Sequence, residues 1–390
     1  MKKILSFTWL LLAAAMFTAF SCEGGDDPIE PVDPENPTTI KSITLKCDKD
    51  VIKCDGKDAS TLTVVADDGT VLKEGVTFYN GETEITVSDF KFKTSKDGTY
   101  AVWAAYKTFN SQQVSIMAIN ADVPSVATDP KPSSTSFARK VFITQFTGTG
   151  CGYCPAMVYT MKGALAKEGL KDKTVIAASH SYNNNDPAYI SSPNAGNFGG
   201  SGYPYLAVDM AVGYGDYTSE SKLVSTLKSR YDAEKAKAGI SANSVFVEKL
   251  LPSATGAYED YLIVRVSVKA AETGEYTVGT WLLEDGIYGK QTDGMGVKKQ
   301  DPNHDYDNHD NCLRVADSKN GNSWIGHDLG KIETGKTAEK TFLLRVKGDW
   351  KLENMHMAIF VGAKNADGKY SINNVVDCPV NAATPFKYAN

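Results

Sequence analysis

One short motif constrains this chain more than any other feature: Cys151 and Cys154 enclose Gly-Tyr and are followed directly by Pro155. The apolar and β-branched run at 141–146 precedes the pair and predicts a buried strand. Proline is tolerated in the first turn of a helix, where its missing N–H costs nothing, and apolar residues then recur on one helical face up to about residue 168. The motif therefore predicts a strand, a cysteine pair and a helix in succession, which is typical of an α/β unit.

A C-x-x-C pair is compatible with half of a zinc site, a structural disulfide or a redox centre. Zinc needs two further ligands, and no second C-x-x-C or histidine pair lies nearby in the sequence. A helix N-terminus stabilises a thiolate, so Cys151 is expected to have a depressed pKa and to act as the nucleophile. Cys154, which lies deeper in the turn, would then be the resolving cysteine.

A second proline supports this interpretation. Pro204 follows Tyr203 and directly precedes an apolar run at 205–210, although central strands usually exclude proline. Together with the cysteine motif, it makes residues 138–240 resemble the thioredoxin superfamily. The resemblance implies a cis Pro204 that faces the cysteines, with Tyr153 and Tyr203 beside an extended substrate backbone. Further strands are expected at 174–179 and 205–210, and a second helix from 220 to about 237.

The chain also resembles the outer-membrane-protein-28-related family of lipoproteins over about residues 138–380. The resemblance lies in the segments 146–155, 311–314 and 358–361. It implies a C-x-x-C core followed by a β-rich C-terminal domain, and it says more about architecture than about activity.

One residue departs from the pattern of thioredoxin-like oxidoreductases. Many of them carry a buried acid six residues before the first cysteine, whereas this chain has Gln145. An amide cannot accept a proton at neutral pH, so reductase turnover should be slow unless another base serves. His180 is the titratable candidate, and its alternative role is an imidazole that makes hydrogen bonds at a strand end.

The N-terminus has the layout of an export signal. Two lysines precede an apolar run that ends at Ser21-Cys22, which predicts a signal peptide at 1–21. The segment resembles a bacterial lipobox, which implies that Cys22 is acylated and anchors the protein to a bilayer. Residues 22–39 alternate acids with prolines and predict a flexible tether. We expect an outer-membrane lipoprotein that is exposed at the cell surface, with the periplasmic face as the alternative.

The remaining sequence predicts two flanking β-domains. Short strand-like runs with Asp-Gly and Asn-Gly turns at 40–122 indicate an immunoglobulin-like β-sandwich, and a Pro-rich linker follows at 123–137. Alternating strands at 241–390 indicate a C-terminal antiparallel β-sandwich. The expected fold class is thus α+β multidomain, with the thioredoxin-like α/β domain at 138–240 between the two sandwiches.

Cysteine usage fits an oxidising compartment. Apart from Cys22 and the C-x-x-C pair, four cysteines remain, an even number. Their positions in the expected domains predict two structural disulfides, Cys47 with Cys54 and Cys312 with Cys378.

Charge and composition narrow the classes of partner that the protein is expected to bind. The net charge of -6 becomes -8 once the two lysines of residues 1–21 are removed, and no basic stripe is present, so nucleic acid is not expected. No cofactor is predicted. Asp305, Asp307 and Asp310 form a weak calcium candidate, because their loop lacks the glycine and the closing glutamate of an EF-hand.

Two functions remain open from the sequence. The first is a membrane-tethered thiol-disulfide oxidoreductase or isomerase that acts on envelope proteins. The second is a non-catalytic surface binding or scaffold lipoprotein whose C-x-x-C is a structural disulfide.

Overall fold

The computed structural model describes residues 40–252 and 256–389. In these ranges the chain is mostly β, with twenty-five strands, three α-helices and two short 3-10 helices. The helical elements are α1 (Cys154–Leu165), α2 (Glu220–Ala233), the one-turn α3 (Val297–Gln300), η1 (Ala195–Phe198) and η2 (Leu352–Asn354). Sheets therefore provide most of the surfaces on which apolar side chains are buried.

Two small sheets form the N-terminal region. The first contains β1 (Ile43–Cys47), β3 (Ser60–Ala66), β4 (Val71–Leu72) and β7 (Lys91–Phe92). The second contains β2 (Val51–Lys53), β10 (Val114–Ile119), β8 (Gly98–Tyr106), β5 (Val76–Asn80), β6 (Thr83–Ile85) and β9 (Phe109–Asn110). Strand β3 alternates buried and half-buried residues along its length, as a strand with one face on a core must. The β-sandwich content expected at 40–122 is consistent with this arrangement.

The largest element is a sheet of nine strands that crosses the expected domain boundary at residue 240. Its order is β14 (Val212–Tyr214), β13 (Tyr205–Val208), β11 (Val141–Thr147), β12 (Thr174–His180), β20 (Cys312–Asp317), β17 (Gly274–Glu284), β23 (Met355–Lys364) and β24 (Tyr370–Pro379), with β21 (His327–Ile332) also paired to β17. Strands β11, β12 and β20 run parallel, and β12 joins β20 through the pair Ala178 and Cys312. The other pairings are antiparallel.

This sheet corrects the predicted fold class. The expected thioredoxin-like α/β domain at 138–240 is wrong, because its strands do not close a sheet of their own but continue into five strands from beyond residue 270. That segment contributes only two α-helices, and the described chain is dominated by strands. The predicted α+β multidomain class is therefore replaced by a mostly β architecture with several sheets.

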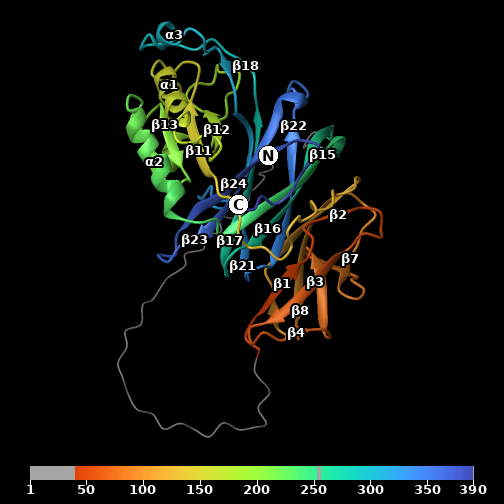
Figure 1. The fold of residues 1–390 in the computed structure, drawn as a ribbon. Coiled ribbons are helices and arrows are strands. Elements are labelled where there is room, and N and C mark those ends of the chain that lie inside the picture. The colour runs from red at the N-terminus through yellow and green to blue at the C-terminus, as the bar shows by residue number, and fades with distance from the viewer. Residues whose placement is uncertain (1–39, 253–255, 390) are drawn as a thin grey trace, which may run out of the picture. The chain divides into compact units, whose positions relative to one another are not determined.

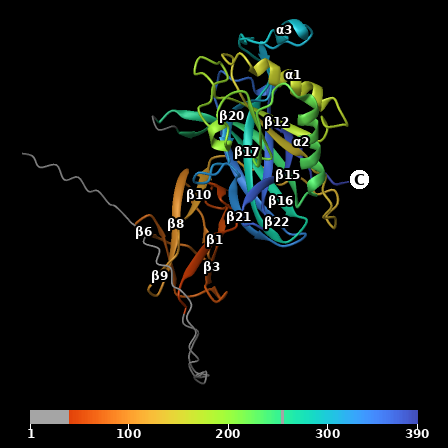
Figure 2. The same cartoon turned by 90° about the vertical axis from the view of Figure 1, so that its left-hand side faces the viewer.

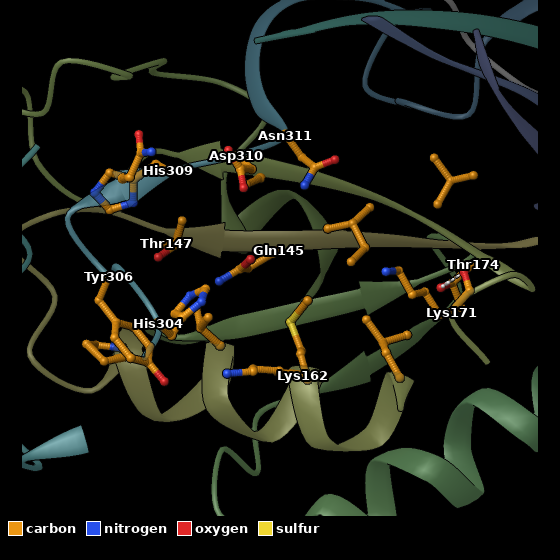
Figure 3. Close-up of a pocket in the computed structure, with 18 of the residues that line it drawn as sticks. Gln145, Thr147, Lys162, Lys171, Thr174, His304, Tyr306, His309, Asp310 and Asn311 are labelled. Carbon is orange, nitrogen blue, oxygen red and sulfur yellow. Dashed lines mark hydrogen bonds between the residues drawn. The ribbon is translucent and has the colours of Figure 1, made fainter. Parts of the chain in front are cut away.

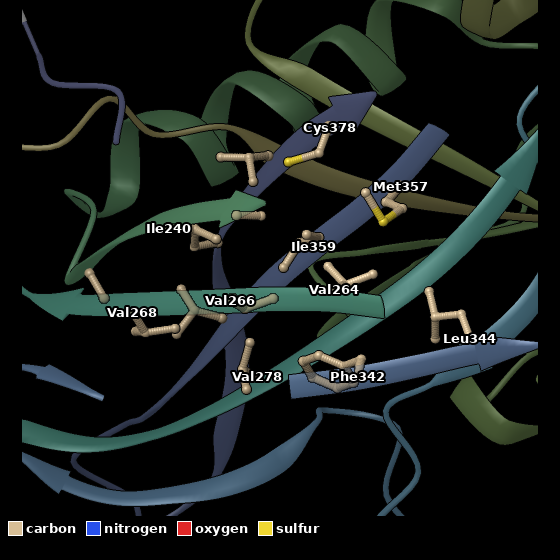
Figure 4. Close-up of a cluster of buried hydrophobic side chains, with 14 of the residues drawn as sticks. Ile240, Val264, Val266, Val268, Val278, Phe342, Leu344, Met357, Ile359 and Cys378 are labelled. Carbon is tan, nitrogen blue, oxygen red and sulfur yellow. The ribbon is translucent and has the colours of Figure 1, made fainter. Parts of the chain in front are cut away.

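A second sheet packs against the C-terminal half of the nine-stranded sheet. It has the order β22 (Thr337–Val346), β16 (Tyr258–Ala270), β15 (Ala238–Pro252) and β25 (Ala383–Thr384). Between the two sheets lies an apolar core in which Val264, Val266, Phe342 and Ile359 are each 1% exposed or less. Figure 4 shows these side chains interleaved between β16, β22 and β23. The β-sandwich content expected at 241–390 is consistent with this packing.

Helices α1 and α2 cover one face of β11 and β13 (Figures 1 and 2). Met157 and Met161 of α1 and Leu223 and Leu227 of α2 pack on the valines and isoleucine of these strands. The opposite face is closed differently, because Phe142 of β11 contacts the rings of Trp281 and Phe360 at centroid distances of 5.3 and 5.2 Å. The nine-stranded sheet is thus so strongly curved that strands distant in its order share one core.

A buried charge cluster fastens β11 to β13 and α2. The fully buried Asp209 follows β13 and accepts hydrogen bonds from Arg139 Nη2 at 2.9 Å and from Phe142 N at 2.8 Å. Arg230 of α2 donates to the same carboxylate at 3.2 Å. Two guanidinium groups and a backbone N–H offset only part of the desolvation of this carboxylate, because burial still raises the pKa of Asp209.

Candidate functional site

Cys151 and Cys154 form a disulfide at the carboxyl end of β11. Their Cα atoms are 5.4 Å apart. Helix α1 begins at Cys154, with Pro155 in its first turn, as the sequence predicts. The two cysteines are only 2% and 1% exposed, so Cys151, which the sequence predicts as the nucleophile, is buried and oxidised in this structure.

A segment between β17 and β20 covers this disulfide. The chain leaves β17, forms a two-stranded sheet from β18 (Ile287–Tyr288) and β19 (Asn308–His309), and carries α3 between them. We call residues 289–307 the cap. Figures 1 and 2 show α3 beside α1. Val297 of α3 packs with Ala156 in the first turn of α1 and with Tyr306. The cap thus lies over the beginning of α1.

Backbone hydrogen bonds fix the cap to the motif itself. Gly294 N donates to Gly152 O at 2.8 Å, and Thr292 N donates to Thr149 O at 2.8 Å. The Gln291 amide donates to Cys151 O at 2.9 Å, and Gln291 is 6% exposed. A Cβ at Gly294 would lie 3.2 Å from Gly152 O, so glycine allows the two backbones this close approach.

Asp186 also stabilises the loop that precedes Cys151. Its carboxylate accepts the N–H of Thr149 at 2.6 Å and that of Ala188 at 2.8 Å, and it lies 2.8 Å from Nδ1 of His180. Burial raises the pKa of Asp186, but the hydrogen bond and charge of His180 with the two backbone N–H groups outweigh it, and the pKa falls to about 2. His180 Nε2 lies 3.6 Å from Cys312 Sγ. His180 is therefore engaged on both ring nitrogens, as its alternative role required, and is not a free base.

The residues expected to bind a substrate lie near the motif but are partly engaged. The Tyr203-Pro204 bond is cis, and Pro204 directly precedes β13, whose Tyr205 pairs with Phe146 at the same end of the sheet. Tyr203 donates to Ser181 O at 3.2 Å and contacts its hydroxyl at 3.0 Å, so its hydroxyl points into the protein. Tyr153 is 51% exposed.

Neither predicted disulfide outside the motif is present. Cys47, Cys54, Cys312 and Cys378 are free thiols. In the sheet order, β17 and β23 separate the strand of Cys312 from the strand of Cys378, so the two cysteines do not lie on neighbouring strands. Cys47 lies on β1, whereas Cys54 follows β2 in the other N-terminal sheet.

The weak calcium candidate is not assembled. Asp307 pairs with Lys298, Asp310 accepts the N–H of Gly286, and Asp305 accepts the N–H of Asp307 in a local turn. Over residues 40–252 and 256–389, no group of three or more histidine, cysteine or acidic side chains is placed to hold a metal ion. These aspartates instead stabilise the cap and its neighbouring loop.

A cavity of about 720 Å³ lies beside the disulfide, between α1, β12 and the segment 304–311 (Figure 3). Gln145, Thr147 and His180 line it from the sheet, and Gln291 connects it to the cysteine motif. Sequence reasoning missed Gln291, Asp186 and the role of the cap, because their contacts are made to backbone atoms more than thirty residues away and leave no sequence pattern.

The predicted signal peptide, the lipidated Cys22 and the tether at 22–39 lie outside the described residues. Within the part that is described, no helix is long and apolar enough to cross a membrane.

Comparisons with known proteins add little to this picture. No family model matches the chain, and no curated protein matches it. A solved structure, HBP35 of Porphyromonas gingivalis, is similar with 15% identity and a TM-score of 0.48, over 64% of this chain and 78% of that one. Three N-terminal domains of the highly immunogenic outer capsid protein of bacteriophage RB49 match with 6% identity and a TM-score of 0.14, over 90% and 99% of the two chains. Likenesses this weak support no argument about function.

Proposed function

We propose that this protein is a non-catalytic binding lipoprotein of the bacterial envelope, in which the Cys151–Cys154 disulfide is structural. One observation supports the proposal above the others: both cysteines are buried beneath a cap that is hydrogen-bonded to the motif's own backbone. Disulfide exchange requires a thiolate to reach one sulfur of the bond. A covered disulfide of this kind resists exchange until the cap opens.

The surroundings of the motif support the same conclusion. The position from which an acid would serve the resolving cysteine is Gln145, and the nearby His180 is held by Asp186 and Cys312. The site thus lacks the acid expected at position 145, and its cysteines are buried.

Trapping tests this proposal. Cys154→Ser leaves Cys151 as the attacking thiol of an oxidoreductase that cannot resolve its mixed disulfides. We expect the full-length variant to recover no disulfide-linked adducts from an envelope extract, like its matched control Cys151→Ser/Cys154→Ser. An established oxidoreductase with the equivalent substitution serves as the positive control. Adducts at Cys151 that are absent from the double variant would contradict the binding function and indicate oxidoreductase activity instead.

Anchoring at the outer membrane is the second part of the proposal, and it rests on the sequence at Ser21-Cys22. Acyl chains on Cys22 would attach the protein stably to the bilayer. Cys22→Ala should therefore move the protein from the detergent phase to the aqueous phase in a partitioning experiment. Equal retention of both proteins in membranes would contradict the lipoprotein assignment.

A further inference from the structure

The cavity beside the disulfide contains two buried polar side chains without partners. Gln145 and Thr147 lie on the same face of β11, are 6% and 5% exposed, and line the cavity. Within the described residues, neither side chain has a hydrogen-bond partner, and Figure 3 shows both directed into the open space. Both polar groups open to the cavity, so a ligand or water there can complete their hydrogen bonds.

The rest of the cavity is an apolar and aromatic enclosure. Pro155, Val158 and Met161 of α1 form one wall, and Ile176 and Ala178 of β12 form the floor. The rings of His304 and Tyr306, whose centroids are 4.4 Å apart, lie at the beginning of α1, where Tyr306 packs with Ala156. A volume of about 720 Å³ is in the range of sites for small organic molecules.

Two of the charged groups at the Gln145 end of the cavity are paired, whereas Lys140, Lys171 and Asp172, which precede β11 and β12, line its other end. His180 is held by Asp186 at 2.8 Å, and Lys162 pairs with Asp301 at 2.6 Å. Burial lowers the pKa of His309, so this ring is neutral, and its Nε2 lies 2.9 Å from Gly289 O. A charged group inserted beside Gln145 would lose its hydration and meet charges that are already paired, which favours an uncharged ligand at this end of the cavity.

From this arrangement we infer that the cavity binds an uncharged, flat heterocycle through an amide or imide edge. An amide side chain presents a donor beside an acceptor and can pair with an N–H and a C=O that are adjacent on a ring. Gln145 supplies that pair, and Thr147, two residues along the same strand face, bonds the next polar atom of the edge. The apolar side chains of β12 and α1 enclose the two faces of the heterocycle, and the rings of His304 and Tyr306 lie at one end.

This inference rests on the proposed binding function and gives it a ligand class. The probe is lumichrome, a neutral and fluorescent tricyclic imide, titrated with the full-length oxidised protein. The matched ligand is its N-methylated analogue, which has the same ring system but no ring N–H donor. We expect saturable binding of lumichrome, with an affinity about tenfold higher than that of the analogue, because one hydrogen bond to a buried partner is lost.

Variants connect binding to the cavity. Gln145→Leu and Thr147→Val should each weaken lumichrome binding about tenfold and reduce the preference over the analogue, whereas Ile176→Trp should abolish binding of both by filling the space. Gln113→Leu, at an exposed position of the N-terminal region, is the control and should bind as the parent does. Circular dichroism identifies any variant that does not fold, and the two ligands on the unmodified protein still test the inference.

No saturable binding of lumichrome, or equal binding of both ligands, would overturn the inference. These results are separate from the trapping experiment. Adducts at Cys151 would reject the structural role of the disulfide, whereas the titration reports only on the cavity.

Discussion

The two halves of the nine-stranded sheet are held in different ways. Around β17 and β23, the sheet packs on a second sheet through fully buried aliphatic and aromatic side chains (Figure 4). At the end of β11, the structure is held by the disulfide, by Asp186 and by backbone hydrogen bonds from the cap. The first region follows from periodic apolar residues, and the second depends on individual polar contacts. Substitutions in the two regions should therefore differ in how much stability they remove and in the measurement that detects the loss.

The largest effect is expected in the apolar region. Phe342→Ala removes a side chain that is 1% exposed between the sheets and should lower the free energy of unfolding by about 3–5 kcal/mol. Urea denaturation followed by circular dichroism measures it. Val71→Ala, at a residue that is 48% exposed, is the control and should change stability by about 0.5 kcal/mol or less. Similar losses of stability at both positions would show that burial does not determine the effect of these substitutions.

The buried charge cluster should come next. Arg139→Met leaves Asp209 with one guanidinium partner in a site without water contact, at a cost of about 3 kcal/mol. Lys228→Met, which breaks ion pairs that are half exposed, should cost less than about 1 kcal/mol in the same denaturation experiment. An equally small loss for Arg139→Met would mean that this cluster does not fasten β11.

The disulfide itself should contribute less than either. Replacing both cysteines, Cys151→Ala/Cys154→Ala, removes a very short closed loop, so the expected loss is about 2 kcal/mol. The apolar region is untouched, and the denaturant dependence of unfolding should stay the same. A loss as large as that of Phe342→Ala would mean that the disulfide organises more of the fold than its own end of the sheet.

The smallest effect should depend on pH, at an ion cluster between the end of β17 and the beginning of β23. Burial lowers the pKa of His356, but the nearby carboxylates of Asp285, at 3.4 Å from Nε2, and of Asp377, which is hydrogen-bonded to Nδ1, outweigh it and raise the pKa to about 9. A raised pKa stabilises the folded state fully below the unfolded value near 6.5, and this stabilisation is lost as the pH rises through about 9. His356→Gln should thus cost about 1 kcal/mol at pH 6 and almost nothing at pH 10, since both carboxylates are about half exposed. A pH-independent difference would exclude this ion cluster as the cause.

The sequence predicts local elements well here and their assembly poorly. Strand β11, helix α1 and strand β12 lie where periodicity and proline placement put them, within a few residues. The assembly differs because β12 pairs with β20 through a single residue pair, Ala178 and Cys312, more than 130 residues apart. A strand pattern specifies which face is buried but not which edge is paired. An isolated C-x-x-C unit and the beginning of a larger sheet therefore look alike in the sequence.

The candidate site was also predictable only in part. The position of the cysteines before α1 and the cis Tyr203-Pro204 bond agree with what the sequence and the resemblance implied. The burial of the cysteines was not predictable, because the cap contacts them through Gln291 and through the backbone of Gly294. Backbone contacts of this kind impose little on side-chain identity beyond the glycine.

The reduction potential of the Cys151–Cys154 pair tests the central claim most directly. Equilibration of the full-length protein with dithiol buffers, followed by alkylation and mass spectrometry, gives this value for the folded state. A disulfide that is buried under the cap and serves only the fold should have a potential below about -300 mV. A potential between about -120 and -270 mV, the range of dedicated thiol-disulfide oxidoreductases, would contradict the account.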